Sequence, residues 1–334
     1  MSNLRKYNVA VVGATGAVGK VMLEILEERK FPIKNLKLLA SERSEGKTVK
    51  FSGADLPVEA LTEKSFGGVE IALFSAGADR SRVFAPAAVK SGAVVIDNTS
   101  YYRMDPNVPL VVPEVNPQDI KKHHGIIANP NCSTIGMVLV LAPIHKAAKI
   151  KRVVVTTFQS VSGAGATAIQ ELKDQVAAWV KGEKLVAKKM AYQIAFNCLP
   201  QIDDFLESGY TKEEIKMVNE TKKIIGDPAI QVTATCVRVP VFFAHSESVT
   251  IETEKKLSAK NVREILSKAP GVIVMDDPAN KKYPMPIDVQ GRDETFVGRI
   301  REDISHPSSI SLWLVSDNLR KGAATNAVQI AEHL

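Results

Sequence analysis

Short apolar runs alternate with helix-like stretches over the first third of the chain. Five of these runs are candidate strands: Asn8–Val12, Leu36–Ala40, Val69–Phe74, Ala93–Ile96 and Ile126–Ala128. A strand that is apolar at nearly every position is typical of a parallel sheet with helices on both faces. The alternation therefore predicts an α/β domain built on a doubly wound parallel sheet.

From about Lys151 onward the β-rich runs become longer and the helical signals fewer. The candidate strands here are RVVVTTFQSV, AIQVTATCVRVPVFF, ESVTIETE, GVIVMDD and Ile310–Val315. They predict a mixed or antiparallel sheet in a second domain of α+β type. We expect residues 1–131 and a C-terminal helix at 318–334 to form the first domain, and residues 132–317 to form the second.

The second domain also carries a prediction about assembly. Apolar runs such as VRVPVFF, with few helices predicted to cover them, leave a sheet face that one chain does not bury. A second copy of the same face is the simplest cover, so we expect an obligate homodimer formed by this domain, with a tetramer as its further association.

Composition excludes several classes of protein. The 334 residues are 45% hydrophobic and 24% charged, which suits two folded domains and not a disordered chain. The longest apolar stretch lies within GMVLVLAPIH, short of the roughly 20 residues of a membrane span. The N-terminal MSNLRKYNVA has no apolar core of a signal peptide, so we expect a cytoplasmic protein. The net charge of +6 is mild and spread along the chain, which argues against a nucleic-acid partner.

The first predicted strand runs directly into a glycine-rich loop, GATGAVG (Gly13 to Gly19), and a helical pattern follows. Glycines permit a tight turn and let backbone N–H groups approach a pyrophosphate at the positive end of the helix. The spacing G-x-x-G-x-x-G alone is a weak signal, because such turns also close ordinary strand–helix units. Its position after the first strand and before a helix favours a Rossmann-like dinucleotide site.

Cofactor choice depends on the end of the second strand, where an acidic residue favours NAD and an arginine favours NADP. The sequence there is Ser41-Glu42-Arg43-Ser44. Glu42 supports one cofactor, and Arg43 with its flanking serines supports the other. We predict NADP, with Glu42 as a solvated loop residue.

The segment NPNCST, Asn129 to Thr134, places Cys132 at the start of an apolar helix. The partial positive charge of a helix N-terminus stabilises a thiolate, which activates the sulfur as a nucleophile. Most free cysteines are small buried hydrophobes, and that interpretation suits Cys198 and Cys236. The polar neighbours of Cys132 favour the reactive alternative.

A cysteine nucleophile needs a group that manages protons, and histidine is the usual one. The best-placed candidate is His245 in RVPVFFAHSES, seven residues after Arg238. Strand alternation puts positions seven apart on opposite faces, so a bend must intervene if both line one pocket. No metal-binding spacing such as His-Glu-x-x-His occurs, and we predict no metal site.

Together, NPNCST, GATGAVG and RVPVFFAHSES resemble the aspartate-β-semialdehyde dehydrogenase family over essentially the whole chain. The resemblance implies that Cys132 is the acylated nucleophile, His245 the general acid/base and Gln159 the residue that orients the substrate. It assigns Arg238 to the substrate α-carboxylate and Glu220 to its amino group.

The same resemblance implies a phosphate site and a cofactor site. NETKK offers both Lys222 and Lys223, and the family spacing selects the second. The phosphate site then contains Ser100, Arg103, Asn131 and Lys223. The cofactor positions are Gly13, Thr15, Gly16, Ala17, Val18, Arg43, Ser44, Ser162, Gly163 and Asn318.

The implied activity is the NADPH-dependent conversion of 4-aspartyl phosphate to aspartate semialdehyde, a step toward lysine, threonine and methionine. A thiolate displaces phosphate, and a hydride reduces the resulting thioester. Malonyl-CoA reductase and N-acetyl-glutamyl-phosphate reductase share this logic, although Glu220 and Arg238 favour an amino-acid substrate. A non-catalytic dinucleotide sensor is the alternative from another class.

Overall fold

The computed structural model describes residues 5–334. The chain forms two compact units. The first unit contains the residues up to Asn131 together with the C-terminal segment Ala323–Leu334. The second unit is Cys132–Gly322. Residues 318–322, which we expected in the first domain, lie with the second because Asn318 bonds to Ser162 there.

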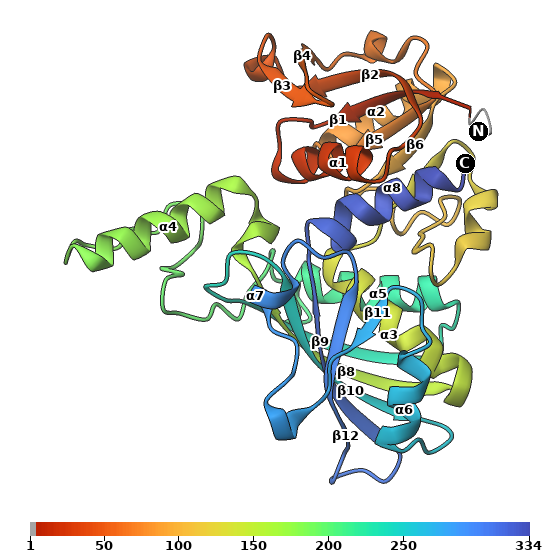
Figure 1. The fold of residues 1–334 in the computed structure, drawn as a ribbon, viewed down its shortest axis with the longest axis vertical. Coiled ribbons are helices and arrows are strands. Elements are labelled where there is room, and N and C mark those ends of the chain that lie inside the picture. The colour runs from red at the N-terminus through yellow and green to blue at the C-terminus, as the bar shows by residue number, and fades with distance from the viewer. Residues whose placement is uncertain (1–4) are drawn as a thin grey trace. The chain divides into compact units, whose positions relative to one another are not determined.

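Unit 1 contains a seven-stranded sheet in the order β3-β4-β2-β1-β5-β6-β7 (Figure 1). All pairs are parallel except β3 with β4, and without β3 the order is that of a dinucleotide-binding fold. The predicted doubly wound α/β class is confirmed. The strands are β1 (Tyr7–Val12), β2 (Ile33–Ala40), β3 (Thr48–Phe51), β4 (Ala54–Ala60), β5 (Ile71–Phe74), β6 (Val94–Asp97) and β7 (Ile126–Ala128).

The helices of unit 1 are α1 (Ala17–Glu28), α2 (Ala78–Lys90) and α8 (Thr325–Glu332). They flank the sheet, and α1 and α8 contact one another (Figure 1). The α1 face that turns inward carries Met22, Ile25 and Leu26, spaced three to four residues apart, so the helix buries one apolar stripe. This stripe joins the core formed by the apolar strands.

Unit 2 is built on a mixed six-stranded sheet in the order β11-β12-β13-β10-β8-β9. Strand β10 is antiparallel to both of its neighbours, whereas β8 and β9 are parallel. The strands are β8 (Ile150–Gln159), β9 (Gln231–Arg238), β10 (His245–Thr253), β11 (Val272–Val274), β12 (Thr295–Glu302) and β13 (Ser309–Ser316).

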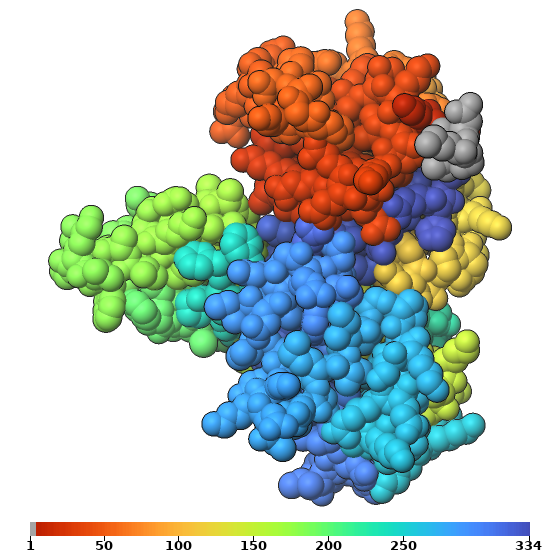
Figure 2. Space-filling model, viewed as in Figure 1, coloured from red at the N-terminus to blue at the C-terminus, as the bar shows by residue number. Residues whose placement is uncertain are grey.

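Helices cover one face of this second sheet. They are α3, α5 and α6, and their contacts fall on all six strands, β8 to β13. Helix α4 extends away from the sheet and forms the green arm of Figure 2. The bounds are α3 (Cys132–Ala148), α4 (Ala166–Val180), α5 (Lys212–Ile225), α6 (Ala259–Leu266) and α7 (Pro286–Val289).

The expectation of few covering helices is wrong for the face beneath α3 and α5. The opposite face has half-buried side chains, among them Thr156, Phe158 and Trp313, and the short α7 contacts β13. In the part of the chain that the structure describes, no helix is both long and apolar enough to span a membrane.

Candidate active site

Polar side chains gather at one end of the second sheet. Gln159 and Arg238 are the last residues of the parallel strands β8 and β9 and lie opposite each other. His245 is the first residue of antiparallel β10 and pairs with Ser316, the last residue of β13. These four strand ends therefore meet at one edge. The expected bend between Arg238 and His245 is the connection from β9 to β10, and β8 lies between the two strands.

The amide of Gln159 is held between opposite charges. Its Nε2 donates to Glu213 Oε1 at 3.3 Å and to Thr157 Oγ1 at 3.4 Å. Its Oε1 accepts from Arg238 Nη1 at 3.5 Å. A carboxylate only accepts and a guanidinium only donates, so the reversed amide would lose both contacts. The orientation of Gln159 is thus set by charge.

Glu213 is the buried anion of this arrangement, and sequence reasoning missed it. It lies in the first turn of α5 beside Glu214, whose side chain forms a capping box with Thr211. Lys216 Nζ lies 3.2 Å from Glu213 Oε2 and 2.8 Å from Asp203 Oδ2, so the carboxylate is paired on its far side. In the sequence, Glu213 shows only the pattern of a helix start, with Thr211 and Glu214 as a capping box. Its distance from Gln159 along the chain gave no sign that the two side chains meet.

Arg238 is buried and makes a second bond, from Nη1 to the backbone oxygen of Ser160 at 2.9 Å. Burial lowers the pKa of its guanidinium, and the nearby Glu213 and Cys132 oppose this shift. Arg238 therefore stays a buried cation within electrostatic range of the candidate nucleophile.

His245 is enclosed at the same edge. Its Nδ1 accepts a hydrogen bond from the backbone N–H of Ser160 at 3.1 Å. Its Nε2 is buried and has no partner among residues 5–334. Burial lowers the pKa of the ring well below its ordinary value, and the charge of Arg238 adds to the shift. The imidazole is therefore neutral near pH 7.

Cys132 is the first residue of α3 and is partly exposed. The π-helical segment Arg320–Ala324 passes directly over it, since a Cβ added to Gly322 would lie 2.9 Å from the Cβ of Cys132. The Gly322 N–H donates to the backbone oxygen of Asp317, five residues earlier, at 2.9 Å, which is the hydrogen bond of a π-helix and holds the segment in this position. Only glycine permits this approach to the cysteine.

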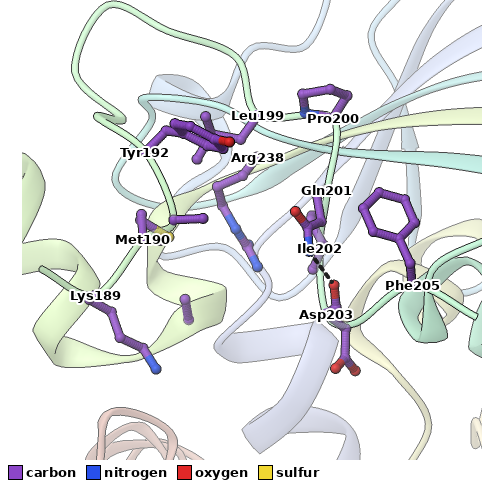
Figure 3. Close-up of a pocket in the computed structure, with 12 residues that line it drawn as sticks. Lys189, Met190, Tyr192, Leu199, Pro200, Gln201, Ile202, Asp203, Phe205 and Arg238 are labelled. Atoms are coloured by element: carbon purple, nitrogen blue, oxygen red, sulfur yellow. Dashed lines mark hydrogen bonds between the residues drawn. The ribbon is translucent and has the colours of Figure 1, made fainter. Parts of the chain in front are cut away.

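A pocket of about 360 Å³ opens beside Arg238 (Figure 3). Its two walls are the segment with Lys189 and Tyr192 and the segment with Gln201 and Asp203, and the Arg238 side chain lies between them. Cys132, Gln159 and His245 are not part of its lining, so it leads to the cationic end of the site only.

In unit 1 the glycine-rich loop fits a dinucleotide. Gly13 has φ +92°, and a Cβ there would lie 2.9 Å from backbone atoms of Ser75. A Cβ on Gly19 would lie 2.2 Å from the Gly13 oxygen. Helix α1 then starts after Gly16 with no side-chain cap, so its first N–H groups suit a pyrophosphate. Each glycine is required by a close backbone approach.

The end of β2 lies beside this loop. The hydroxyl oxygens of Thr15 and Ser44 are 3.4 Å apart. Ser44 is buried, whereas Arg43 and Glu42 are exposed on the short 3₁₀ helix Glu42–Ser44. The exposed guanidinium is available to a ligand, and so is the Glu42 carboxylate.

The predicted phosphate residues are divided between the units. In unit 1, Arg103 is buried and donates to the backbone oxygens of Asn98 and Asn129, each at 2.9 Å. Ser100 is exposed and Asn131 buried in the same unit. In unit 2, Glu220 and Lys223 lie three residues apart on α5, on the stripe that also carries Glu213.

The remaining cysteines differ from each other. Cys236 is buried as expected, and burial raises the pKa of its thiol. The interpretation of Cys198 as a buried hydrophobe is wrong, because it is exposed on the segment before Leu199. Within residues 5–334 no cluster of three His, Cys, Asp or Glu side chains could hold a metal ion.

Comparison with protein families gives two adjoining matches. A family model described as "Semialdehyde dehydrogenase, NAD binding domain" matches residues 8–123. A second, described as "Semialdehyde dehydrogenase, dimerisation domain", matches residues 141–321. Together the two models span most of the chain.

Individual relatives agree with these matches. The chain is 61% identical to an aspartate-semialdehyde dehydrogenase of Aquifex aeolicus, with 98% of each chain covered. It is 54% identical to one of Bacillus subtilis, with 99% of this chain and 98% of the relative covered. It is also similar to a Vibrio cholerae crystal structure of aspartate semialdehyde dehydrogenase II complexed with ASA, with TM-score 0.96, 53% identity and coverage of 99% and 98%. It is also similar to a crystal structure of aspartate semialdehyde dehydrogenase with NADP from Candida albicans, with TM-score 0.77 and 26% identity. That match covers 99% of this chain and 98% of the Candida chain.

Proposed function

We propose, on the premise that this chain belongs to the aspartate-semialdehyde dehydrogenase family, that it converts 4-aspartyl phosphate reversibly to aspartate semialdehyde through a thioester on Cys132. One observation carries this proposal: Gln159, Arg238 and His245 meet at one edge of the second sheet, and the Arg238 guanidinium lies within electrostatic range of Cys132.

Cys132 supplies the nucleophile. Its thiolate displaces phosphate from the substrate and holds the aspartyl group as a thioester, and the start of α3 stabilises the anion. NADPH, when bound, supplies the hydride that reduces the thioester. His245 forms a hydrogen bond with the oxygen of the reacting carbonyl. Expulsion of the Cys132 thiolate then releases the aldehyde.

Arg238 and Gln159 position the substrate. The planar guanidinium suits a bidentate bond to the α-carboxylate, and Glu220 suits the amino group. The amide of Gln159, fixed by Glu213 and Arg238, orients the acyl group beside Cys132. We assign the phosphate to Ser100, Arg103, Asn131 and Lys223.

The cofactor we propose is NADP. Support comes from the glycine-rich loop, from the exposed Arg43 beside buried Ser44, and from the Thr15–Ser44 pair. Arg43 would pair with the 2′-phosphate, and the N-terminus of α1 would hold the pyrophosphate. Ser162, Gly163 and Asn318 are the cofactor positions on unit 2.

We also propose a cytoplasmic homodimer that contributes to the synthesis of lysine, threonine and methionine. The half-buried face of the second sheet and the α4 arm are its candidate contacts. The exposed ring of Trp179 on α4 has its centroid 4.9 Å from that of Phe196, in the segment that follows the helix. Light scattering should show a dimer at micromolar protein, and an active monomer would contradict this proposal.

The test of function is a spectrophotometric assay run in the oxidative direction. Aspartate semialdehyde with NADP should give NADPH only when phosphate is present. NAD should react more slowly, and malonate semialdehyde with CoA should not react. Turnover with malonate semialdehyde and CoA in place of aspartate semialdehyde and phosphate would contradict the proposal and favour a malonyl-CoA reductase.

A further inference from the structure

A set of hydrogen bonds behind His245 determines which of its nitrogens carries the proton. The backbone N–H of Ser160 is 3.1 Å from Nδ1. A backbone N–H can only donate, so Nδ1 must present its lone pair to it. In a neutral ring the single proton then resides on Nε2, the buried atom without a partner among the described residues.

Side chains behind Ser160 support the same arrangement. Asn318 Oδ1 accepts the backbone N–H of Ala244 at 3.1 Å, which fixes the amide so that Nδ2 donates to Ser162 Oγ at 3.0 Å. Ser162 Oγ is 2.9 Å from Ser160 Oγ, which lies 3.1 Å from His245 Nδ1. Both hydroxyls are also 3.1 Å from Asn318 Oδ1, which can accept from either of them. Donation from Asn318 Nδ2 through Ser162 and Ser160 to the imidazole is one direction that these distances allow.

The backbone before His245 shows that this placement is enforced. Ala244 has φ +66°, a left-handed conformation that is unfavourable for alanine, and Asn318 binds its N–H. All four polar members, Ser160, Ser162, His245 and Asn318, are buried. The conformation of Ala244 and its bond to Asn318 thus fix the backbone from which the His245 ring projects.

The free side of the ring faces Gly163. An ideal Cβ at Gly163 would lie 3.1 Å from His245 Nε2 and 2.9 Å from Arg238 Nη1. A side chain at this position would crowd Nε2, so glycine leaves that nitrogen uncovered by residue 163, while Arg238 Nη1 is already bonded to Ser160 and Gln159. A protonated Nε2 suits an oxygen that gains negative charge during a reaction.

We propose that His245, in the resting enzyme, is a neutral ring with its proton on Nε2, held by Ser160 with Ser162 and Asn318 behind it, and that it donates a hydrogen bond to the reacting oxygen. This inference rests on the proposed function and narrows the role of His245. With Nε2 protonated and Nδ1 engaged, the ring has no lone pair with which to take the thiol proton of Cys132.

The chemistry balances without transfer of the imidazole proton. Hydride addition to the Cys132 thioester gives a tetrahedral oxyanion, which the Nε2–H stabilises. The oxyanion re-forms the carbonyl, and the carbon–sulfur bond breaks with its electron pair going to the Cys132 thiolate. The aldehyde leaves, and His245 remains neutral throughout.

The first test is NMR of the full-length protein labelled with ¹⁵N-histidine, without substrate. The chain has six histidines, and loss of one signal in His245→Asn identifies His245. We expect a pyridine-like shift for Nδ1 and a pyrrole-like shift for Nε2 near pH 7.5. Protonated Nδ1, or a doubly protonated ring, would overturn the proposal. Because no substrate is used, this result is independent of whether the proposed function is correct.

The second test separates a hydrogen-bond donor from a base. Alkylation of Cys132 by iodoacetamide is followed across pH by mass spectrometry of its peptide, in wild type and in His245→Asn. Arg238 is the charged group facing both residues and is unchanged. We expect the same midpoint in both proteins. A midpoint that rises when His245 is removed would show that His245 is the base for the thiol and would overturn the donor role.

The third test concerns Ser160 as a positioning residue. Ser160→Ala keeps the backbone N–H and removes the hydroxyl, so we expect kcat to fall about ten-fold with unchanged KM and the Nδ1 resonance to move. Ser311→Ala is the matched control, because it removes a hydroxyl pair with Thr250 in the same sheet, outside the site. Unchanged kcat and an unchanged Nδ1 resonance in Ser160→Ala would refute the role of the hydroxyl.

Discussion

The two units hold their functional groups in opposite ways. The dinucleotide-binding loop of unit 1 works through its backbone, and Gly13 and Gly19 serve by having no side chain. The edge of the second sheet works through side chains, and Gln159, Arg238 and His245 are each held by other polar groups. A backbone site is therefore damaged by adding atoms, and a side-chain site by removing or reshaping them.

The largest effect we expect comes from reshaping the side-chain site with Arg238→Lys. Charge is kept, but the planar guanidinium, whose Nη1 bonds both Ser160 and Gln159, is lost. Misplacement of the substrate by about 1 Å costs on the order of 100-fold in rate. Steady-state kinetics should show this loss in kcat/KM. Arg152→Lys, on the exposed part of β8, is the control. A loss of less than threefold for Arg238→Lys would exclude a bidentate role.

The opposite change is to add a methyl group to the glycine-rich loop of unit 1. Gly13→Ala forces alanine to φ +92° and against Ser75, which costs about 1–3 kcal/mol of stability and weakens NADP binding. Gly67→Ala is the matched control in the same unit, because nothing lies within 4 Å of its ideal Cβ. Denaturant unfolding and cofactor titration measure the two effects. Equal behaviour of both variants would refute the close-approach argument.

Cofactor choice tests the one part of unit 1 that acts through a side chain. Arg43→Ala removes the proposed partner of the 2′-phosphate, so the preference for NADP over NAD should fall about ten-fold. Lys47→Ala, also exposed nearby, should leave the ratio of kcat/KM values unchanged. Equal losses for both cofactors in Arg43→Ala would assign the choice to Glu42 instead.

A smaller effect concerns the pH dependence of the free energy of unfolding, through Glu247 on β10. Glu247 is buried opposite Thr157, and burial raises its pKa well above the ordinary value. Because the pKa of Glu247 is higher in the folded than in the unfolded protein, its contribution to the free energy of unfolding is complete below the unfolded-state pKa. This contribution is lost as the pH rises toward the folded-state pKa. Relative to Glu247→Gln, the wild type should therefore be less stable at pH 7.5 than at pH 5. Unfolding at pH 5 and pH 7.5 measures this, and a constant difference would contradict it.

Much of unit 1 was predictable because its rules are local. Strands buried on both faces are apolar throughout, so β1 and β7 stood out, and the glycines follow β1 directly. The hairpin β3–β4 was missed because it is polar and half exposed, as was β12, whose Gly298 interrupts the pattern.

The side-chain site was only partly predictable. Cys132 carried a local signal at its helix start, but its partners come from strand ends far apart in sequence. The roles of Gln159, Glu220 and Lys223 came from the family resemblance alone. Glu213 and Ser160 carried no signal, because their roles arise from sheet register and from one backbone N–H.

The central claim is the covalent role of Cys132, and mass spectrometry tests it most directly. Enzyme mixed with aspartate semialdehyde and NADP, with phosphate omitted, should accumulate the thioester and is quenched in acid. We predict an aspartyl adduct on the Cys132 peptide and none in Cys132→Ala, which should still bind NADP. Cys198 is the built-in control, because it is also exposed. An adduct on Cys198 or Cys236, or turnover by Cys132→Ala, would contradict the account.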